Sequence, residues 1–234
     1  SAWGKNGLVP ADFEADVNDE ARVSFPWGMI DKITPPPAEI IEKQLMDAGF
    51  EDMQPVITSR NTYIAPFVNA EVPQYLVVED RFPNGRPALD KAGVYLCDRK
   101  TVNDTERMKV TTCLTPLHTA LAVYGCLLGY TSIAAEMKDA ELVKLVKTIG
   151  YKEGLPVVTD PGIISPKAFI DEVVEQRLPN PFIPDTPQRI ATDTSQKVGI
   201  RFGETIKSYM ASDTLNPADL TAIPLALAGW IRYL

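Results

Sequence analysis

The segment from Glu106 to His118 constrains this chain most, because it places a proline and the only histidine directly before a strongly apolar run. Pro116 suits the first turn of a helix, where its missing N–H would have no partner. Thr115 then falls at the N-cap, where its hydroxyl can accept a backbone N–H. The run Ala120–Gly129 is apolar nearly all round, which predicts a buried helix. The polar groups at its start are therefore predicted to be buried too, and buried polar groups need partners.

A lysine and a glutamate lie just upstream of this helix. Glu106 and Lys109 are three residues apart, so they share a face if the stretch is helical. The sequence thus predicts two helix ends that meet, with Lys109 on one and His118 on the other. A Glu–Lys pair at this spacing is also common on solvated faces, and a single histidine near an N-cap is often a packing residue. From the residues alone, both the functional and the structural interpretation stay open.

Composition excludes several classes of function. The net charge of -8 argues against a nucleic-acid surface and against binding to anionic membranes. The sequence contains neither an apolar run of about twenty residues nor a signal peptide. Its three cysteines are odd in number and lack metal-ligand spacing, which indicates reduced thiols of a cytoplasmic protein. A Gly-rich phosphate-binding fingerprint between a strand and a helix is also missing from this sequence.

Periodicity predicts a mostly helical chain with one β-rich region. Residues 1–20 are polar and loop-like, with a turn at Asn6-Gly7. Short runs of β-branched and aromatic residues between 54 and 98 alternate with turn signals, which predicts a small antiparallel sheet. Helices are expected at five other places. They follow Thr34–Pro37 and cover approximately residues 139–148, 166–177, 194–210 and 217–234.

Four blocks of sequence, in order along the chain, carry a resemblance to a known family. They are Phe25–Pro35, Val78–Pro87, Lys109–His118 and Arg189–Lys197. Together they resemble the C-terminal domain of the polyol-specific long-chain dehydrogenases, which include mannitol dehydrogenase and the fructuronate and tagaturonate reductases. The signature of that family is Lys, four residues, Asn, two residues and His. Here Thr115 stands in place of Asn and the first gap is one residue longer, while Trp27 replaces a second Asn of the family pattern.

The resemblance implies a mainly α fold, multi-helical like the C-terminal domain of 6-phosphogluconate dehydrogenase, with a small antiparallel β insertion at about 54–98. It implies that residues 1–20 lead in from a missing N-terminal Rossmann domain, and that residues 21–234 form a substrate-binding and catalytic domain truncated at its C-terminus. That Rossmann domain would be the main binding partner for NAD or NADP. The fragment would be inactive alone.

The resemblance also implies the reaction and the residues that perform it. The expected activity is a nicotinamide-dependent oxidation of a sugar alcohol or sugar acid. Oxidising a secondary alcohol needs a base for the hydroxyl proton and donors for the developing alkoxide. The implied roles are general base for Lys109, binding of the reacting oxygen for His118, proton relay for Glu106, oxyanion donor for Thr115, and substrate contacts for Asp31, Arg189 and Lys197.

Two alternatives stay open at the level of sequence. The first is a non-catalytic helical domain that keeps the family core and has lost the chemistry, which the changes at Trp27 and Thr115 favour. The second is a 6-phosphogluconate-type dehydrogenase domain, which would need a phosphate site that the sequence does not show. The intact set of Glu106, Lys109 and His118 argues against the first alternative.

Overall fold

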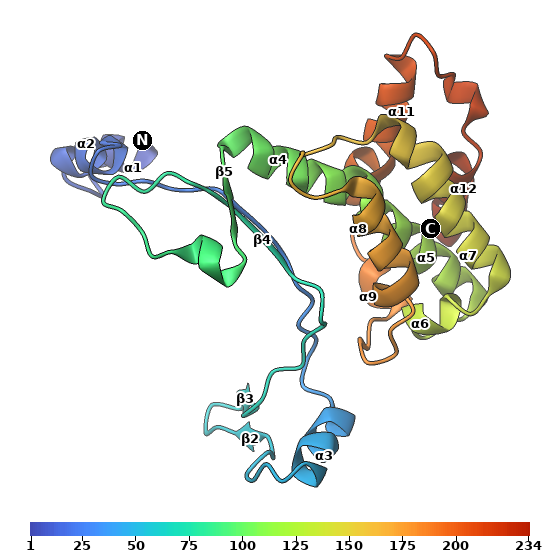
Figure 1. Ribbon diagram of the computed structural model, residues 1–234, viewed down its shortest axis with the longest axis horizontal. Helices are drawn as coiled ribbons and strands as arrows, with labels where there is room; N and C mark the ends of the chain where they lie inside the picture. Colours follow the sequence, from blue (N-terminus) through green and yellow to red (C-terminus); the bar gives the residue numbers. More distant parts are fainter.

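The computed structural model describes residues 1–234, apart from the side chain of Ala11. Residues 99–234 form a helical body, and residues 1–98 extend from it as long segments that carry short helices and strands (Figure 1). The two N-terminal helices lie at one end of these segments. A third helix and a small hairpin lie at the other end (Figure 1).

One long helical segment organises the body. It consists of α4 (Arg99–Met108), a π-turn η2 (Lys109–Cys113) and α5 (Thr115–Leu128). Asp98 caps its start by accepting the Thr101 N–H at 2.7 Å, and Gly129 ends it with a φ of 80°. The side chains of α5 are buried over most of its length, as the sequence predicts. The stretch Arg99–Leu128 is long and apolar enough to cross a membrane, but 67% of its apolar window is buried inside the protein, which is typical of a core helix.

The predicted N-cap at Thr115 is wrong, and so is the prediction of two separate helix ends. Thr115 is the first residue of α5, Leu114 precedes it as the cap position, and no side chain caps the helix. The Thr115 hydroxyl donates instead to the carbonyl of Val110. The reason is that η2 bridges α4 and α5, so the backbone continues through the region where a break was expected.

Further helices pack around α5, chiefly α9 (Pro187–Ala191) and α12 (Ala222–Tyr233). The helical stretches expected after Thr34–Pro37 and in the last hundred residues are confirmed, with π or 3-10 turns continuing several of them. The remaining helical elements of the body are α6 (Ile133–Glu136), α7 (Ala140–Lys147), η3 (Thr148–Gly154), η4 (Leu155–Val157), α8 (Pro166–Glu172), η5 (Val173–Arg177), α9 (Pro187–Ala191), α10 (Thr194–Val198), η6 (Gly199–Gly203), α11 (Glu204–Met210), η7 (Pro217–Asp219) and α12 (Ala222–Tyr233).

The strands differ from the single antiparallel sheet expected at about 54–98. One sheet has the order β1 (Gly28–Asp31), β4 (Tyr75–Glu79), β5 (Tyr95–Cys97); β1 pairs antiparallel with β4, while β5 runs parallel to it. A separate hairpin joins β2 (Val56–Ile57) to β3 (Tyr63–Ile64). Residues 80–94, including η1 (Leu89–Ala92), carry the chain back towards the end at which β4 begins. Strand β5 therefore runs in the same direction as β4.

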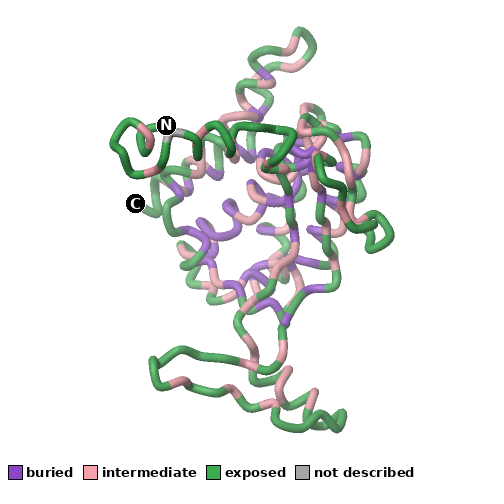
Figure 2. Tube along the Cα trace, turned by 90° about the vertical axis from the view of Figure 1, so that its left-hand side faces the viewer, coloured by how far each residue is buried: buried purple, intermediate pink, exposed green. Residues whose placement is uncertain are grey.

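Residues 1–98 have little core of their own. The helices α1 (Ala2–Lys5) and α2 (Ala11–Asn18) replace the loop expected at 1–20, while α3 (Glu39–Asp47) is the helix expected after Pro37. Among the described residues, only Met29 and Val77 of the buried apolar side chains precede Arg99. The accessible surface is 13854 Å², against about 10,400 Å² for a compact monomer of 25.7 kDa. The excess lies in these exposed segments (Figure 2).

Candidate active site

Lys109 and Glu106 form the ion pair that the sequence predicts. Lys109 lies at the end of α4, and its Nζ is 3.1 Å from Oε2 of Glu106. The same Nζ donates to the carbonyl of Ile30 in β1 at 3.3 Å. The Lys109 side chain is only 13% exposed, whereas that of Glu106 is 48% exposed. Glu106 therefore lies between a largely buried amine and solvent.

The π-turn η2 begins at Lys109 and changes how the spacing to His118 should be interpreted. In a regular helix, residues nine apart lie about 180° apart, at about 100° per residue, and residues eight apart lie about 80° apart. The Leu114 N–H bonds to the Lys109 carbonyl at 3.1 Å, which is an i to i−5 bond. Such a turn holds one residue more than an α-turn. The wider turn therefore accommodates the extra residue relative to the family signature. Lys109 and His118 keep approximately the angle around the helix axis that residues eight apart have in a regular helix.

His118 is held by an aspartate that no pattern in the sequence predicts. Its Nε2 is 3.2 Å from Oδ2 of Asp185, and Oδ1 of the same carboxylate accepts from Nε of Arg189 at 2.8 Å. Burial opposes the ionisation of Asp185, but the hydrogen bonds from His118 and Arg189 outweigh it and hold the pKa of Asp185 below its ordinary value. One carboxylate thus connects His118 with Arg189, two residues that were expected at the site.

Strand β1 and the residues after it connect Lys109 with His118. The Ile30 carbonyl contacts Lys109, while Ile33 lines a small cavity together with His118 and Asp185. Lys109 and His118 therefore lie beside two residues, Ile30 and Ile33, that are three apart in one extended stretch of chain. The cavity beside His118 measures about 20 Å³, and Lys109 is not part of its lining.

Asp31 does not reach that cavity, although it was expected to contact substrate. Its two carboxylate oxygens accept from Arg177 at 2.7 and 3.1 Å. The other donors of Arg177 bind Glu71 at 2.7 and 2.9 Å, and all three side chains are buried. Arg177 itself lines the His118 cavity, so Asp31 lies behind it. In this arrangement Asp31 and Glu71 orient a buried cation and join residues 28–79 to the helical body.

The two remaining predicted site residues, Lys197 and Thr115, donate to backbone carbonyls. Lys197 donates to the carbonyls of Ile190, at 3.0 Å, and of Thr192. Thr115 uses its hydroxyl hydrogen on Val110 and offers no free O–H to a reacting oxygen in this conformation. The structure thus joins Lys109 with Glu106, joins His118 with Arg189 through Asp185, and leaves Asp31 outside both groups.

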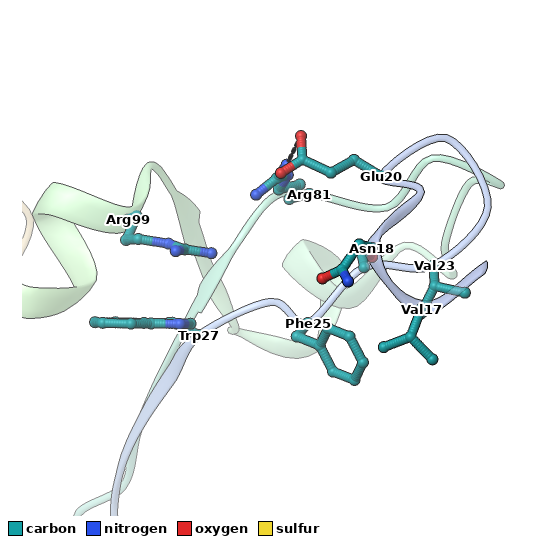
Figure 3. A pocket seen from close by; sticks show the side chains of 9 residues that line it. Val17, Asn18, Glu20, Val23, Phe25, Trp27, Arg81 and Arg99 are labelled. Carbon is teal, nitrogen blue, oxygen red and sulfur yellow. Dashed lines mark ion pairs between the residues drawn. The ribbon is translucent and has the colours of Figure 1, made fainter. Parts of the chain in front are cut away.

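A larger hollow of about 250 Å³ lies at the other end of α4 (Figure 3). The guanidinium of Arg99 lies over the ring of Trp27, 4.6 Å from its centroid, and is held there by Glu79 at 2.9 Å. Arg81, which also lines the hollow, is paired with Glu20 (Figure 3). Each arginine therefore has its own carboxylate.

Throughout the described residues, three or more His, Cys, Asp or Glu side chains nowhere gather in a way that could hold a metal ion.

Comparisons with known proteins agree with this architecture. A family model described as "Mannitol dehydrogenase C-terminal domain" matches residues 101–234. A "D-mannonate oxidoreductase" of Thermotoga maritima is 60% identical over 99% of this chain and 43% of its own length. A "Polyol:NADP oxidoreductase" of Gluconobacter oxydans is 31% identical over 92% of this chain and 40% of its length. The chain spans less than half of these relatives.

Solved structures show the same similarity. A crystal structure of "D-sorbitol dehydrogenase in substrate-free form" superposes with a TM-score of 0.82 at 29% identity, covering 99% of this chain and 43% of that one. A ternary complex of Pseudomonas fluorescens mannitol 2-dehydrogenase "with NAD and D-mannitol" gives a TM-score of 0.71 at 28% identity, over 97% and 42% of the two chains.

Proposed function

Because this chain belongs to the mannitol dehydrogenase C-terminal domain family, we propose that it is the substrate-binding and catalytic domain of an NAD(P)-dependent oxidoreductase. The reaction interconverts a sugar alcohol or aldonate with its ketose or keto-uronate. The observation that supports this best is the placement of the Lys109–Glu106 pair and the His118–Asp185 pair along one helical segment, beside Ile30 and Ile33 of one extended stretch.

In the direction of oxidation, the amine of Lys109 would take the proton of the substrate hydroxyl. General base catalysis by a positioned side chain requires this reach, directly or through one water. His118, oriented by Asp185, would hold the reacting oxygen as negative charge develops on it. Glu106 would pass the proton from Lys109 to solvent, because it is the exposed member of the pair. The nicotinamide, when bound, accepts the hydride from the carbon.

We propose that an N-terminal dinucleotide-binding domain of the same protein holds most of the cofactor. The hollow at Trp27 offers aromatic ring surface to part of such a molecule, while its two arginines are already paired with Glu20 and Glu79. Stacking on an aromatic ring suits a base. Phe25 and Arg81 extend the same lining (Figure 3).

A non-catalytic domain is the second candidate, and one observation favours it. The hydroxyl of Thr115, which occupies the place of a family oxyanion donor, is bound within its own helix to Val110. Losing one such donor typically lowers the rate about 10²–10³-fold. That loss would weaken catalysis without removing the base.

Replacement of Lys109 in the full-length protein separates the two candidates. Lys109→Ala is expected to lower kcat by about 10²–10⁴-fold, the usual contribution of a general base. Lys109→Arg should not restore the rate, because a guanidinium stays protonated at working pH. Nicotinamide-linked turnover and NADH binding are measured side by side, and NADH binding should change little.

The matched control is Lys100→Ala, which removes an exposed lysine from the same helix, paired with Asp104. It should leave both kcat and NADH binding unchanged. If Lys109→Ala kept the full rate, the base would have to be another group. If the unsubstituted full-length protein showed no turnover of any polyol or aldonate, the non-catalytic candidate would hold instead.

A further inference from the structure

A buried carboxyl group lies between three helices close to His118. Helices α6 and α9 both pack on α5 (Figure 1). Glu136, the last residue of α6, is fully buried, and within the described residues neither of its carboxylate oxygens has a hydrogen-bond partner. A Cβ added at Gly125 of α5 would lie 2.1 Å from Oε1 of Glu136 and 2.9 Å from Cβ of Pro187, the first residue of α9. The carboxyl group is therefore enclosed between α5 and the start of α9.

The same single turn of helix holds the aspartate that binds His118. The N–H of Ile133, the first residue of α6, donates to the backbone carbonyl of Asp185 at 3.1 Å. The Ile133 side chain is 3% exposed and lines the cavity beside His118 together with Asp185. Asp185 also lies two residues before Pro187, which packs beside Glu136. Two short connections thus lead from Glu136 to Asp185, one along α6 and one along the chain into α9.

None of the titratable groups that sense the charge of Glu136 is a cation. Within the described residues, they are Cys126 of α5 and Tyr130, which follows that helix. Cys126 is hydrogen-bonded to Tyr233 of α12, and the Tyr130 hydroxyl donates to Asp139 at 2.9 Å. These thiol, phenol and carboxylate groups cannot offset a negative charge on Glu136.

The cations of the neighbouring elements are exposed or already paired. Lys138, which follows α6, is exposed to solvent. Arg189, the cation of α9, is paired with Asp185, and His118 of α5 is bound to the same carboxylate. An ionised Glu136 would therefore be a buried charge without a counter-ion, which is costly. Water could solvate this charge only if α6 moved away from α5.

We propose that Glu136 is a positioning residue, which in its protonated form keeps α6 packed on α5 and so holds Asp185 against His118. In the proposed function, on which this inference rests, His118 binds the reacting oxygen. Ionisation of Glu136 draws the end of α6 towards solvent, and Ile133 then releases the carbonyl of Asp185. His118 loses the carboxylate that orients it, so the developing charge on the reacting oxygen is stabilised less well.

The pH at which this change should occur follows from burial, which raises the pKa of Glu136 to about 8. At about pH 9, about ten ionised molecules are present for each protonated one, so kcat/KM should be about tenfold lower if only the protonated form orients His118. Above about pH 8, both the folded and the unfolded chain carry this charge, and the free energy of unfolding no longer depends on Glu136. A loss of activity in that range is therefore separate from a loss of stability.

The test compares the full-length protein with its Glu136→Gln variant, whose amide has the shape of the protonated acid and stays neutral. D-mannonate or D-mannitol serves as substrate, and kcat/KM is measured for both proteins from about pH 6 to about pH 9. The ratio of the unsubstituted protein to the variant should be constant up to about pH 7 and should fall about tenfold by about pH 9. Groups that titrate in both proteins cancel in this ratio.

The matched control is Glu141→Gln, which makes the same change in charge at a side chain that is 84% exposed in α7. The ratio for this control should not change with pH. An equally constant ratio for Glu136→Gln would overturn the inference.

If Glu136→Gln does not fold, Gly125→Ala decides. The added Cβ displaces the carboxyl group of Glu136 without changing its charge, so kcat/KM should fall already at neutral pH. An unchanged kcat/KM in Gly125→Ala would overturn the inference.

Nuclear magnetic resonance of the His118 ring distinguishes this inference from the proposed function. The ring signals are assigned by comparison with His118→Gln, and the Nε2 signal reports the hydrogen bond to Asp185. A change in this signal between about pH 7 and pH 9 that is absent from Glu136→Gln supports the inference even without turnover, in which case only the proposed function fails. Turnover together with an Nε2 signal that is the same in both proteins at every pH would overturn the inference and leave the proposed function intact.

Discussion

Glu136 in α6 is the feature of this fold that should respond most strongly to pH. Its side chain is fully buried, and within the described residues neither carboxylate oxygen has a hydrogen-bond partner. It fits against α5 only because residue 125 is glycine: a Cβ there would lie 2.1 Å from Oε1 of Glu136. Cys126 and Tyr130 are the titratable groups that sense its charge. Burial raises the pKa of Glu136 to about 8.

The size and sign of the effect follow from this pKa. Below about pH 4.5, the carboxyl is protonated in both the folded and the unfolded chain, so its burial carries no charge penalty. Between about 4.5 and about 8, the unfolded chain releases the proton while the folded protein keeps it, and the free energy of unfolding falls as pH rises. At about 1.36 kcal/mol per unit, the loss reaches roughly 5 kcal/mol and is complete above pH 8.

The substitution Glu136→Gln removes this titration at nearly constant shape. Urea unfolding of both proteins between about pH 5 and pH 9 should give free energies that diverge with pH, until the variant is more stable by roughly 5 kcal/mol. Glu141→Gln is the control, because Glu141 is exposed in the neighbouring helix α7 and should give parallel curves. Parallel curves for Glu136→Gln as well would show that Glu136 is not a buried neutral acid, and the reasoning would fail.

Two further substitutions test the packing. Arg177→Ala would leave Asp31 and Glu71 as uncompensated buried carboxylates, so the free energy of unfolding, measured in urea, should fall by about 3–5 kcal/mol; a change near zero would contradict the buried network. Gly125→Ala should destabilise by about 1–3 kcal/mol through overpacking against Glu136, whereas Gly199→Ala, where a Cβ meets open space in a helix, should stabilise by about 0.5–1 kcal/mol; melting of both variants checks the opposite signs.

The helical part of the fold could be predicted from the sequence because its signals are local. The apolar run after Pro116 and the proline at the start of α8 each act within one or two turns of chain. The sheet could not be predicted in the same way. Gly28 pairs with Val78, fifty residues away, and no periodicity within either strand specifies that partner or the parallel addition of β5.

The contacts of the candidate site also divide into local ones, which the sequence predicts, and long-range ones, which it does not. Lys109 and Glu106 are three residues apart, so a helical period suffices to join them. Asp185 reaches His118 from the loop before α9, and the partners of Arg177 are more than a hundred residues away in sequence. Arg177 ends an amphipathic helical stretch, residues 166–177, in which Lys167 is also charged, so the local pattern does not single out Arg177 as buried.

The two departures from the family signature in this segment are best understood as one structural change. An extra residue between Lys109 and Thr115 would turn Lys109 and His118 to opposite faces of a regular helix. The turn widens instead, with the Leu114 N–H bonded to the Lys109 carbonyl. The Thr115 hydroxyl bonds to the Val110 carbonyl, also five residues earlier, and so closes the widened turn from its other end. The short hydroxyl side chain of Thr115 can make this bond within the turn that the extra residue widens. The substitution and the insertion therefore support one another, and together they keep Lys109 and His118 from turning to opposite faces of the helical segment.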